Sequence, residues 1–475
     1  MHTIDYIIIF IYLGMIILAG FIGLKKAKSK EDYLVSGRSL PLPIFICCIS
    51  TVVIGGGATF GQATNGYLYG ISATWMVTMF GVGVLALGFL LSSKLSNLRI
   101  LTIGEMLRLR YDQKAQWLSS VISAFYTIMV AVTNTIALGA CIQTIFGWSL
   151  STSILIVSCI CILYTLLGGM ISLNIMDVIQ FILMTVAIFF VLLPSGFFHL
   201  GGINGLRAAL PDSYFAPFAV GRMKIFSWFI LFTLGLMIGQ DVWQRVFTAK
   251  NCKVAKQGTI VAGIYIILWA GAMTLAGMFA MVLLPDISSQ NALSEITLAV
   301  VPSGFIGVVF AGIISAFMST IAGTIIASST LISNDILKLK SNSLWSSRIT
   351  IVVIGLVVML TAIKIGSVLT ALDIAYAILS GSIFVPVVAG FFWKRANWQG
   401  AVTSMLISSV VILVSMVKFG TSSPFPILIG IVTSFITLVF ISLFTAPLPE
   451  KQASIWEEKL SSEESDAFFD ECSCK

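Results

Sequence analysis

Charged residues are scarce in this chain. Aspartate, glutamate, lysine and arginine together supply 10% of its 475 residues, whereas 58% are hydrophobic. A typical soluble domain carries about 25% charged residues, so water is not the main solvent of this protein. Apolar runs recur from end to end of the chain, and each is long enough to cross about 30 Å of hydrocarbon. The composition therefore predicts an all-α protein that crosses a lipid bilayer many times.

Groups that carry enzyme chemistry are also scarce. The two histidines, His2 and His199, can form neither a proton relay nor a metal cluster. Cys472 and Cys474 form a C-x-C pair with no second pair or histidine beside it, which argues against a zinc site. We find no nucleophile–base pair and no phosphate-binding loop in the sequence, so we do not expect an enzyme.

The apolar runs predict about thirteen transmembrane helices, with boundaries accurate to a few residues. The predicted spans are residues 4–24, 42–69, 73–93, 117–146, 149–168, 172–197, 225–246, 257–284, 303–334, 347–366, 372–393, 399–417 and 425–446.

The basic residues predict the side of the membrane on which each loop lies, because cytoplasmic loops are enriched in lysine and arginine. With the N-terminus outside, the outer side keeps only five basic residues, Arg207, Arg222, Lys224, Lys364 and Lys418. Every other lysine and arginine, Arg245 included, then falls on the cytoplasmic side. The net charge of +7 is thus spread over short loops between spans, which argues against nucleic-acid binding. We expect a multi-pass protein of the plasma or inner membrane with a cytoplasmic C-terminus.

Three consecutive glycines, Gly55 to Gly57, interrupt the second predicted span, and Gly61 follows them. Glycine weakens a helix by up to about 1 kcal/mol relative to alanine. In a membrane, a break in a helix is tolerated only where protein buries it or where it lines a wet cavity. Close packing between helices through small residues is the alternative explanation. Several glycines close together favour a broken helix.

A second interruption occurs five spans later, where Gly235 and Gly239 lie inside a span beside Gln240 and Asp241. Interrupted spans at corresponding places in two halves indicate a transporter built from inverted repeats. Because five spans separate the breaks, the two repeats insert with opposite orientations. We expect a transporter domain over residues 1–446, with five-plus-five repeats at about 42–197 and 225–393, and a short acidic cytoplasmic tail over residues 447–475.

The ninth predicted span is rich in hydroxyl groups, and Ser319 and Thr320 are adjacent within it. Most such hydroxyls bond to a carbonyl of the preceding helical turn. Hard cations bind oxygen ligands, and divalent ions prefer several carboxylates. Two neighbouring hydroxyls and carbonyls freed at a helix break could instead form a neutral cage for a monovalent ion.

Four motifs in order along the chain resemble those of the sodium:solute symporter family, which includes bacterial proline and galactose symporters and their sugar and choline relatives. They are "EDYLVSGRSLP" (Glu31–Pro41), "YTLLGGMISLNIMDVIQ" (Tyr164–Gln180), "GQDVWQRVFTAKNCKVAKQG" (Gly239–Gly258) and "AFMSTIAGTIIASSTLISNDIL" (Ala316–Leu337). The resemblance covers residues 1–446 and implies sodium-coupled symport of a small solute across the bilayer.

The resemblance also implies a sodium site. The matching positions are the carbonyls of Thr51, Ile54 and Ala316 and the hydroxyls of Ser319 and Thr320. Asp177 matches an aspartate that the family uses near the sodium path, although it could equally cap a short cytoplasmic turn.

The solute does not follow from the resemblance. The proline-type symporters have an aspartate where this chain has Val53, and the choline relatives have tryptophans at the positions of Val53 and Gly239. Gly57 and Ala58 replace a polar pair of the galactose symporter, and Gly235 replaces its gating tyrosine. A quaternary ammonium needs an aromatic cage. Val53 and Gly239 stand where the choline relatives have two tryptophans of that cage.

The residues at the breaks predict the solute site. The candidates are Gly55, Gly56, Gly57, Thr59, Gln62, Asn134, Thr233 and Gln240. We expect no lysine, arginine or carboxylate to point into the predicted cavity from the middle of the broken spans, where a charge would be a functional residue by default. A neutral solute, a zwitterion or a small carboxylate held by half-helix N-termini would fit.

Two alternatives to sodium symport remain open at this stage. The first is proton coupling in the same fold, with Asp177 as the carboxylate nearest to a span of the first repeat. The second is a membrane sensor or receptor that keeps the transporter fold. The oligomeric state does not follow from the sequence.

Overall fold

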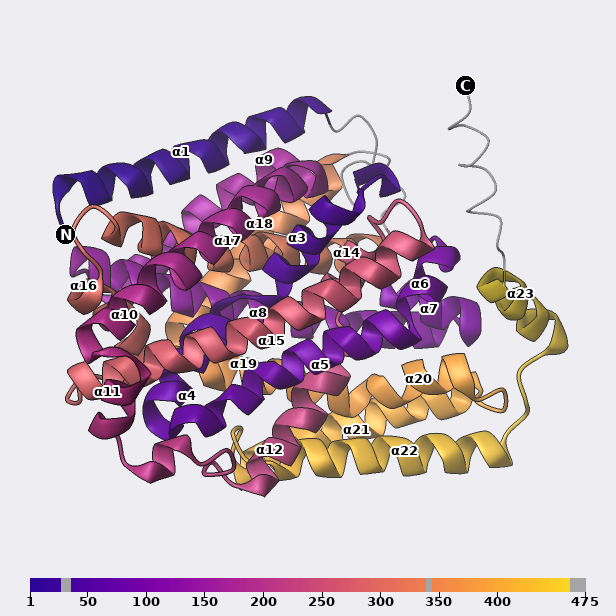
Figure 1. Ribbon diagram of the computed structural model, residues 1–475. Coiled ribbons are helices and arrows are strands. Elements are labelled where there is room, and N and C mark those ends of the chain that lie inside the picture. The colour runs from indigo at the N-terminus through magenta and orange to yellow at the C-terminus, as the bar shows by residue number, and fades with distance from the viewer. Residues whose placement is uncertain (27–35, 339–343, 462–475) are drawn as a thin grey trace.

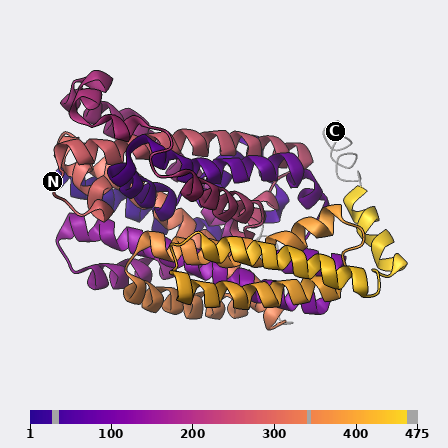
Figure 2. The same cartoon turned by 90° about the horizontal axis from the view of Figure 1, so that it is seen from below.

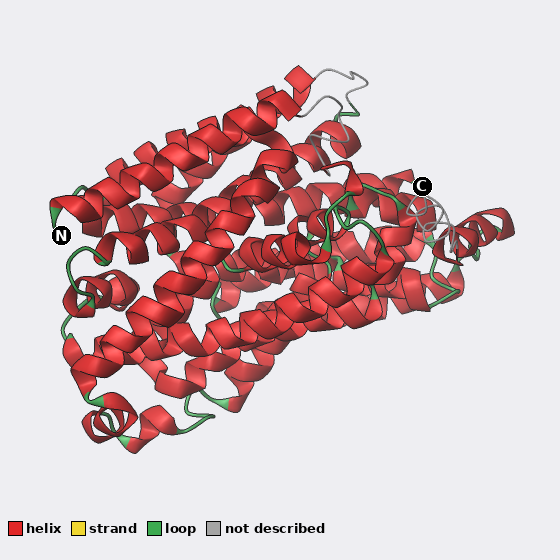
Figure 3. Cartoon of the chain, turned by 45° about the horizontal axis from the view of Figure 1, so that its top comes forward, coloured by secondary structure: helices red, strands yellow, loops and turns green. Residues whose placement is uncertain are grey.

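The computed structural model describes residues 1–26, 36–338 and 344–461 (Figure 1). Over these residues the regular elements are helices (Figure 3). The start of the motif at Glu31 and the end of the acidic tail, with Cys472 and Cys474, lie outside the described residues.

The long helices run side by side across the molecule (Figures 1 and 2). The first half of the chain contains α1 (Thr3–Lys26), α3 (Leu42–Val53), η2 (Gly57–Gly61), α4 (Gln62–Tyr69), α5 (Trp75–Leu90), α8 (Gln113–Phe146), α9 (Leu150–Thr185), η4 (Val186–Leu192) and α10 (Leu193–Leu200). The second half contains α12 (Arg222–Trp228), η6 (Phe229–Thr233), α13 (Leu234–Met237), α14 (Gln240–Val246), α15 (Cys252–Leu283), α17 (Ile306–Thr330), η8 (Leu331–Ile336), α18 (Leu344–Ile365), α19 (Val368–Ser382), α20 (Phe384–Phe392), α21 (Trp398–Phe419) and α22 (Phe425–Phe444).

Shorter helices lie between these elements or follow them. They are η1 (Ser36–Arg38), η3 (Gly70–Thr74), α6 (Ser92–Leu98), α7 (Ile103–Arg110), α11 (Gly202–Ala209), η5 (Asp212–Phe215), η7 (Ser289–Asn291), α16 (Ala292–Val300) and α23 (Glu450–Ser461).

The described residues include 10 helices that are long and apolar enough to cross a membrane, or up to 11 when the bent pair Arg222–Met237 and Gln240–Val246 is one span. Leu42–Val53 and Leu150–Leu166 are shorter apolar helices. All thirteen predicted spans contain helix. The run Gly57–Leu90 joins parts of two predicted spans. Within α9, Gly169 has a non-helical backbone with φ 56° and ψ −162°, which separates Leu150–Leu166 from the span Gly169–Leu200 close to the predicted boundary between residues 149–168 and 172–197.

The core of the bundle is α17, which packs against α8 and α9. Within the most apolar window of its span, 94% of the residues are buried, against 28% for α22. The apolar outer faces of α21 and α22, which pack on each other at one edge of the molecule, are suited to contact lipid (Figure 1). The start of α1 and the helix α23 lie at opposite ends of the bundle (Figure 1).

The glycine run does break its helix. Helix α3 ends at Val53, and Ile54 has a non-helical backbone with φ −84° and ψ 77°. The chain resumes through η2 into α4. A Cβ atom added to Gly55 would lie 2.2 Å from Oδ1 of Asn134, and one added to Gly56 would lie 2.6 Å from Cβ of Ala137. Both explanations of the glycine run therefore apply. The glycines break the helix, and they also allow α8 to pack closely against the backbone at the break.

The second predicted break also exists. Helix α13 ends at Met237, and Gly239 has an extended backbone with φ −65° and ψ 125° before α14 begins. The two pieces are bent by 42° relative to each other. Broken segments thus occur at both of the places that the repeat pattern predicts.

Candidate functional site

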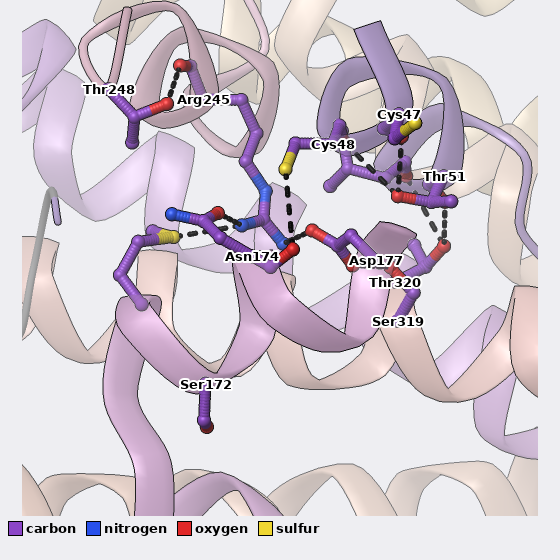
Figure 4. Close-up of polar contacts among 12 residues, drawn as sticks. Cys47, Cys48, Thr51, Ser172, Asn174, Asp177, Arg245, Thr248, Ser319 and Thr320 are labelled. Carbon is purple, nitrogen blue, oxygen red and sulfur yellow. Dashed lines mark hydrogen bonds and ion pairs between the residues drawn. The ribbon is translucent and has the colours of Figure 1, made fainter. Parts of the chain in front are cut away.

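Helices α3, α9, α14 and α17 meet in one buried polar cluster (Figure 4). The break after Val53 explains why α3 contributes backbone groups to it, since the last carbonyls of a helix have no partner within that helix. Helix α17 runs past this end, and α9 and α14 bring charged side chains.

Thr320 links α17 to the broken end of α3. Its Oγ1 lies 3.3 Å from the carbonyl oxygen of Thr51, 3.2 Å from that of Val52 and 3.2 Å from that of Ala316. The structure therefore brings together Thr51, Ala316 and Thr320, three of the predicted sodium ligands. Ile54, a fourth, is the residue at which the helix breaks, but no described hydrogen bond joins its carbonyl to Thr320.

Ser319 connects the cluster to a charge. Its hydroxyl donates to Oδ1 of Asp177 over 2.6 Å, and both residues are fully buried. Asp177 therefore does not cap a surface turn, which was one of its two predicted roles. It lies directly beside the hydroxyl pair of α17.

Arg245 neutralises Asp177. The guanidinium Nη2 lies 2.9 Å from Oδ2 of Asp177, and Nη1 donates to Oδ1 of Asn174 over 2.7 Å. Arg245, which the sequence assigns to a cytoplasmic loop, lies in helix α14 instead, and its side chain is 1% exposed. Helix α14 directs the Arg245 side chain into the protein. A buried arginine needs an oppositely charged partner there.

Asn134 holds the first break from the other side. Its Oδ1 accepts a hydrogen bond of 2.6 Å from the backbone N–H of Gly56, and its amide donates to the carbonyl of Val130. The predicted residues Gly55, Gly56 and Asn134 thus form one unit, with Thr320 also against Gly55. Gly57 contacts Leu372 of α19.

The other predicted solute residues do not gather there. Gln62 donates to the carbonyl of Ala73 and to Thr274, Thr233 donates to the carbonyl of Met79, and Gln240 bonds to the backbone of residues 101 and 103. Thr59 is buried, and its hydroxyl has no hydrogen-bond partner among the described residues. Their roles in solute binding stay predictions.

Sequence reasoning noted Asp241 beside the second break but gave this carboxylate no role. Asp241, in the first turn of α14, is 4% exposed and accepts a hydrogen bond from the hydroxyl of Tyr126 on α8. That hydroxyl also bonds to the hydroxyl of Tyr376 on α19. The expectation that no charge points into the solute cavity stays a prediction, although Asp241 lies in the first turn after the second break. The residue stands in the Gly239–Gly258 motif, and its position in the first turn after a break could have signalled it.

A family model confirms the resemblance. The model of the sodium:solute symporter family matches residues 33–408. The chain belongs to the sodium:solute symporter family. It is therefore a membrane transporter, and sodium is its coupling ion.

Individual relatives in this family carry different solutes. The chain is 25% identical to sodium/glucose cotransporter 4 of Mus musculus, over 95% of this chain and 77% of the relative. It is 23% identical to the high-affinity proline transporter of Bacillus subtilis, over 90% and 96%, and 26% identical to the sodium/pantothenate symporter of Haemophilus influenzae, over 84% and 87%. Two of these three names include sodium, and each of the three names a different solute.

Solved structures share the fold. A sodium-coupled sialic acid symporter in a substrate-bound, outward-open state aligns with a TM-score of 0.80 at 21% identity, over 94% of this chain and 99% of the other. A transporter of the nucleobase-cation-symport-1 family, closed with bromovinylhydantoin bound, aligns with a TM-score of 0.58 at 12% identity, over 90% and 98%. The predicted transporter fold is thereby confirmed, and at these identities the likeness concerns the fold alone.

Proposed function

We propose that this symporter moves a small organic solute together with sodium by alternating access, and that sodium binds where the broken end of α3 meets α17. The contact of the Thr320 hydroxyl with carbonyls of both segments supports this position most directly. Carbonyls of Thr51, Ile54 and Ala316 and the hydroxyls of Ser319 and Thr320 would hold the ion.

The oxygen set suits a monovalent ion. The five proposed ligands are neutral oxygens, and Asp177 supplies a single negative charge beside them through Ser319. A divalent cation would call for more carboxylates. Because Asp177 is already paired with Arg245, we propose that it orients Ser319 and lies on the path of sodium toward the cytoplasm.

Sodium would act by tying two parts of the transporter together. An ion that binds α3 and α17 at once favours conformations in which these segments are close, and it shifts the population by its difference in affinity. The solute site would lie between the two breaks, next to Gly55, Gly56 and Asn134. Opening toward the cytoplasm would separate α3 from α17 and release both cargoes.

The sodium gradient is sufficient for accumulation. One sodium ion that moves through 100 mV yields about 2.3 kcal/mol, and a tenfold concentration gradient adds about 1.4 kcal/mol. With one sodium per solute, these sum to roughly 500-fold accumulation of the solute.

We also propose that the N-terminus lies outside and the C-terminus in the cytoplasm. The distribution of lysine and arginine supports this orientation. Because Arg245 is buried, it no longer counts toward this argument. The orientation stays the same, because many other basic residues are assigned to the cytoplasmic side.

A two-stage experiment tests the function. Purified protein in nanodiscs is screened against small solutes by thermal unfolding, with sodium or potassium chloride at equal ionic strength. A solute that stabilises the protein only with sodium is then tested for uptake into proteoliposomes. We expect a sodium gradient at equal pH to drive uptake.

The alternatives give different results. Uptake driven by a pH gradient without sodium would support proton coupling and contradict the proposal. Sodium-dependent binding without uptake would instead support a sensor that keeps the transporter fold.

A further inference from the structure

Asp241 differs from the other fully buried carboxylates in how its charge is compensated. Asp177 pairs with Arg245. Asp335 accepts hydrogen bonds from Thr102, Gln116 and Ser120, and Asp5 accepts three from the backbone of His2, Gly304 and Gly307. Beside the N–H groups of its own turn, Asp241 accepts from Tyr126 alone among the described side chains.

Asp241 forms none of the described ion pairs. Arg245, one turn further along α14, attracts Asp241 electrostatically, but its ion pair is with Asp177. An ionised side chain inside a membrane protein is rare and generally has a charged or functional partner. A buried charge without such a partner is strongly destabilising, so a cation delivered by a ligand would resolve the imbalance.

A cluster of aromatic rings extends from Tyr126, the hydrogen-bond partner of this carboxylate. The ring of Tyr376 lies 5.2 Å from those of Tyr126 and Phe232 and 5.8 Å from that of Phe80, between ring centres, and Phe80 lies 4.7 Å from Phe232. Four helical segments, α5, α8, η6 and α19, contribute these rings. Aromatic faces attract an organic cation by about 0.5–2 kcal/mol each.

The cluster lies at the junction of the two broken helices. On α19, Leu372 contacts Gly57 at the first break, and Tyr376, one turn later, contacts Gly235 at the second. A Cβ atom added to Gly239 would lie 2.9 Å from Oδ1 of Asp241 and 3.1 Å from the Tyr126 hydroxyl. Glycine at positions 235 and 239 therefore keeps Asp241 and Tyr376 within reach of the region between the breaks.

We propose that the transported solute carries a protonated amine on a compact apolar or aromatic body, and that the amine binds to Asp241 among the rings of Phe80, Tyr126, Phe232 and Tyr376. This inference rests on the proposed symport function and adds the solute class to it. The ammonium donates to the carboxylate, and the apolar body lies against the rings. Binding displaces the rings from one another by side-chain rotation, because they are in mutual contact in this structure.

Matched solute pairs test the charge of the solute. Thermal unfolding of the full-length protein in nanodiscs with sodium is measured with 2-phenylethylamine, benzylamine or cyclohexylamine and with the alcohol of the same skeleton. We expect the amines to raise the unfolding temperature and the alcohols to have much less effect. Equal shifts within the pairs, or no shift with any amine, would overturn the proposal.

Two variants test the site, and a variant of another carboxylate, on the helix that carries Tyr376, is the control. In Asp241→Asn, we expect amine affinity to fall by roughly 30-fold or more, as for the loss of one partner of a buried charge pair. In Asp373→Asn on α19, whose carboxyl faces Lys224 instead, we expect no change. Phe232→Leu, which removes one ring at similar volume, should weaken amine binding roughly 2- to 30-fold and provides a second test if Asp241→Asn does not fold.

The sodium response separates this inference from the proposed function. Each variant is also titrated with sodium in the absence of amine. A normal sodium response with unchanged amine binding in Asp241→Asn overturns the assignment of the amine site alone. Loss of the sodium response in the wild type would instead overturn the proposed sodium coupling.

Discussion

At the scale of single residues, the contact between Asp177 and Arg245 dominates the electrostatics of the site. Both side chains are almost completely buried, and their oxygen and nitrogen atoms lie 2.9 Å apart. Removal of one partner from a buried ion pair leaves an uncompensated charge, whereas removal of both is much less costly.

We predict that Asp177→Asn and Arg245→Gln each lower the free energy of unfolding by about 3–5 kcal/mol. The double variant should lose less than the sum of the two. Denaturant or thermal unfolding of the four proteins in the same detergent measures this coupling. Additive effects would show that the two residues do not stabilise the fold as a pair.

Sequence reasoning identified the oxygen groups of the proposed sodium site, but it did not identify the ion pair beside them. Ser319 and Thr320 were recognisable as an adjacent hydroxyl pair, and the break after Val53 predicted free carbonyls nearby. The pairing of Arg245 with Asp177 was not predictable, because no pattern indicated that α14 turns its arginine inward. Asp241 was given no role for a related reason, since its partner Tyr126 is distant in sequence.

At the scale of helices, the first glycine break is the most sensitive element. An added methyl group on Gly55 would overlap Asn134 and the Thr320 hydroxyl, so it would force α8 and α17 away from the break. Gly14 in α1 is a matched control, because a Cβ atom there would meet no other atom within 4 Å.

We predict that Gly55→Ala abolishes sodium-dependent stabilisation and lowers the unfolding temperature, whereas Gly14→Ala leaves both within error of the wild type. The expected loss of stability at Gly55 is about 1–3 kcal/mol, as for overpacking elsewhere. Sodium titrations followed by thermal unfolding measure both effects. A normal sodium response in Gly55→Ala would contradict the assigned position of the break beside the ion.

The helices themselves were predictable because some 20 apolar residues in lipid have few alternatives to a helix. Their connections were less predictable. The sequence pattern separates residues 42–69 from 73–93, but the structure has one helical run from Gly57 to Leu90. Hydrophobicity alone cannot distinguish such a run from two helices with a short turn.

At the scale of the whole molecule, the orientation in the membrane is the main open prediction. The predicted thirteen spans would place the two ends of the domain on opposite sides of the membrane. The start of α1 and helix α23 lie at opposite ends of the bundle (Figure 1). The distribution of basic residues decides which side is cytoplasmic.

We predict that a cysteine introduced at Ser213 reacts with a membrane-impermeant maleimide in intact cells, and that one introduced at Glu450 reacts only after permeabilisation. Both positions are exposed, so neither requires unfolding to react. The parent protein, with its native cysteines, is labelled in parallel to correct for background. The reverse pattern would show that the protein is inserted in the opposite orientation.

The central claim is that sodium binds between α3 and α17 through Ser319 and Thr320. The most direct test titrates sodium against potassium at constant ionic strength and follows thermal unfolding of the wild type, Ser319→Ala/Thr320→Ala and Thr324→Ala. The Thr324 hydroxyl bonds within its own helix and serves as the control. We predict that wild type and control gain about 1.4 kcal/mol per tenfold increase in sodium above the dissociation constant, while the double variant gains nothing. The same gain in the double variant would contradict the account.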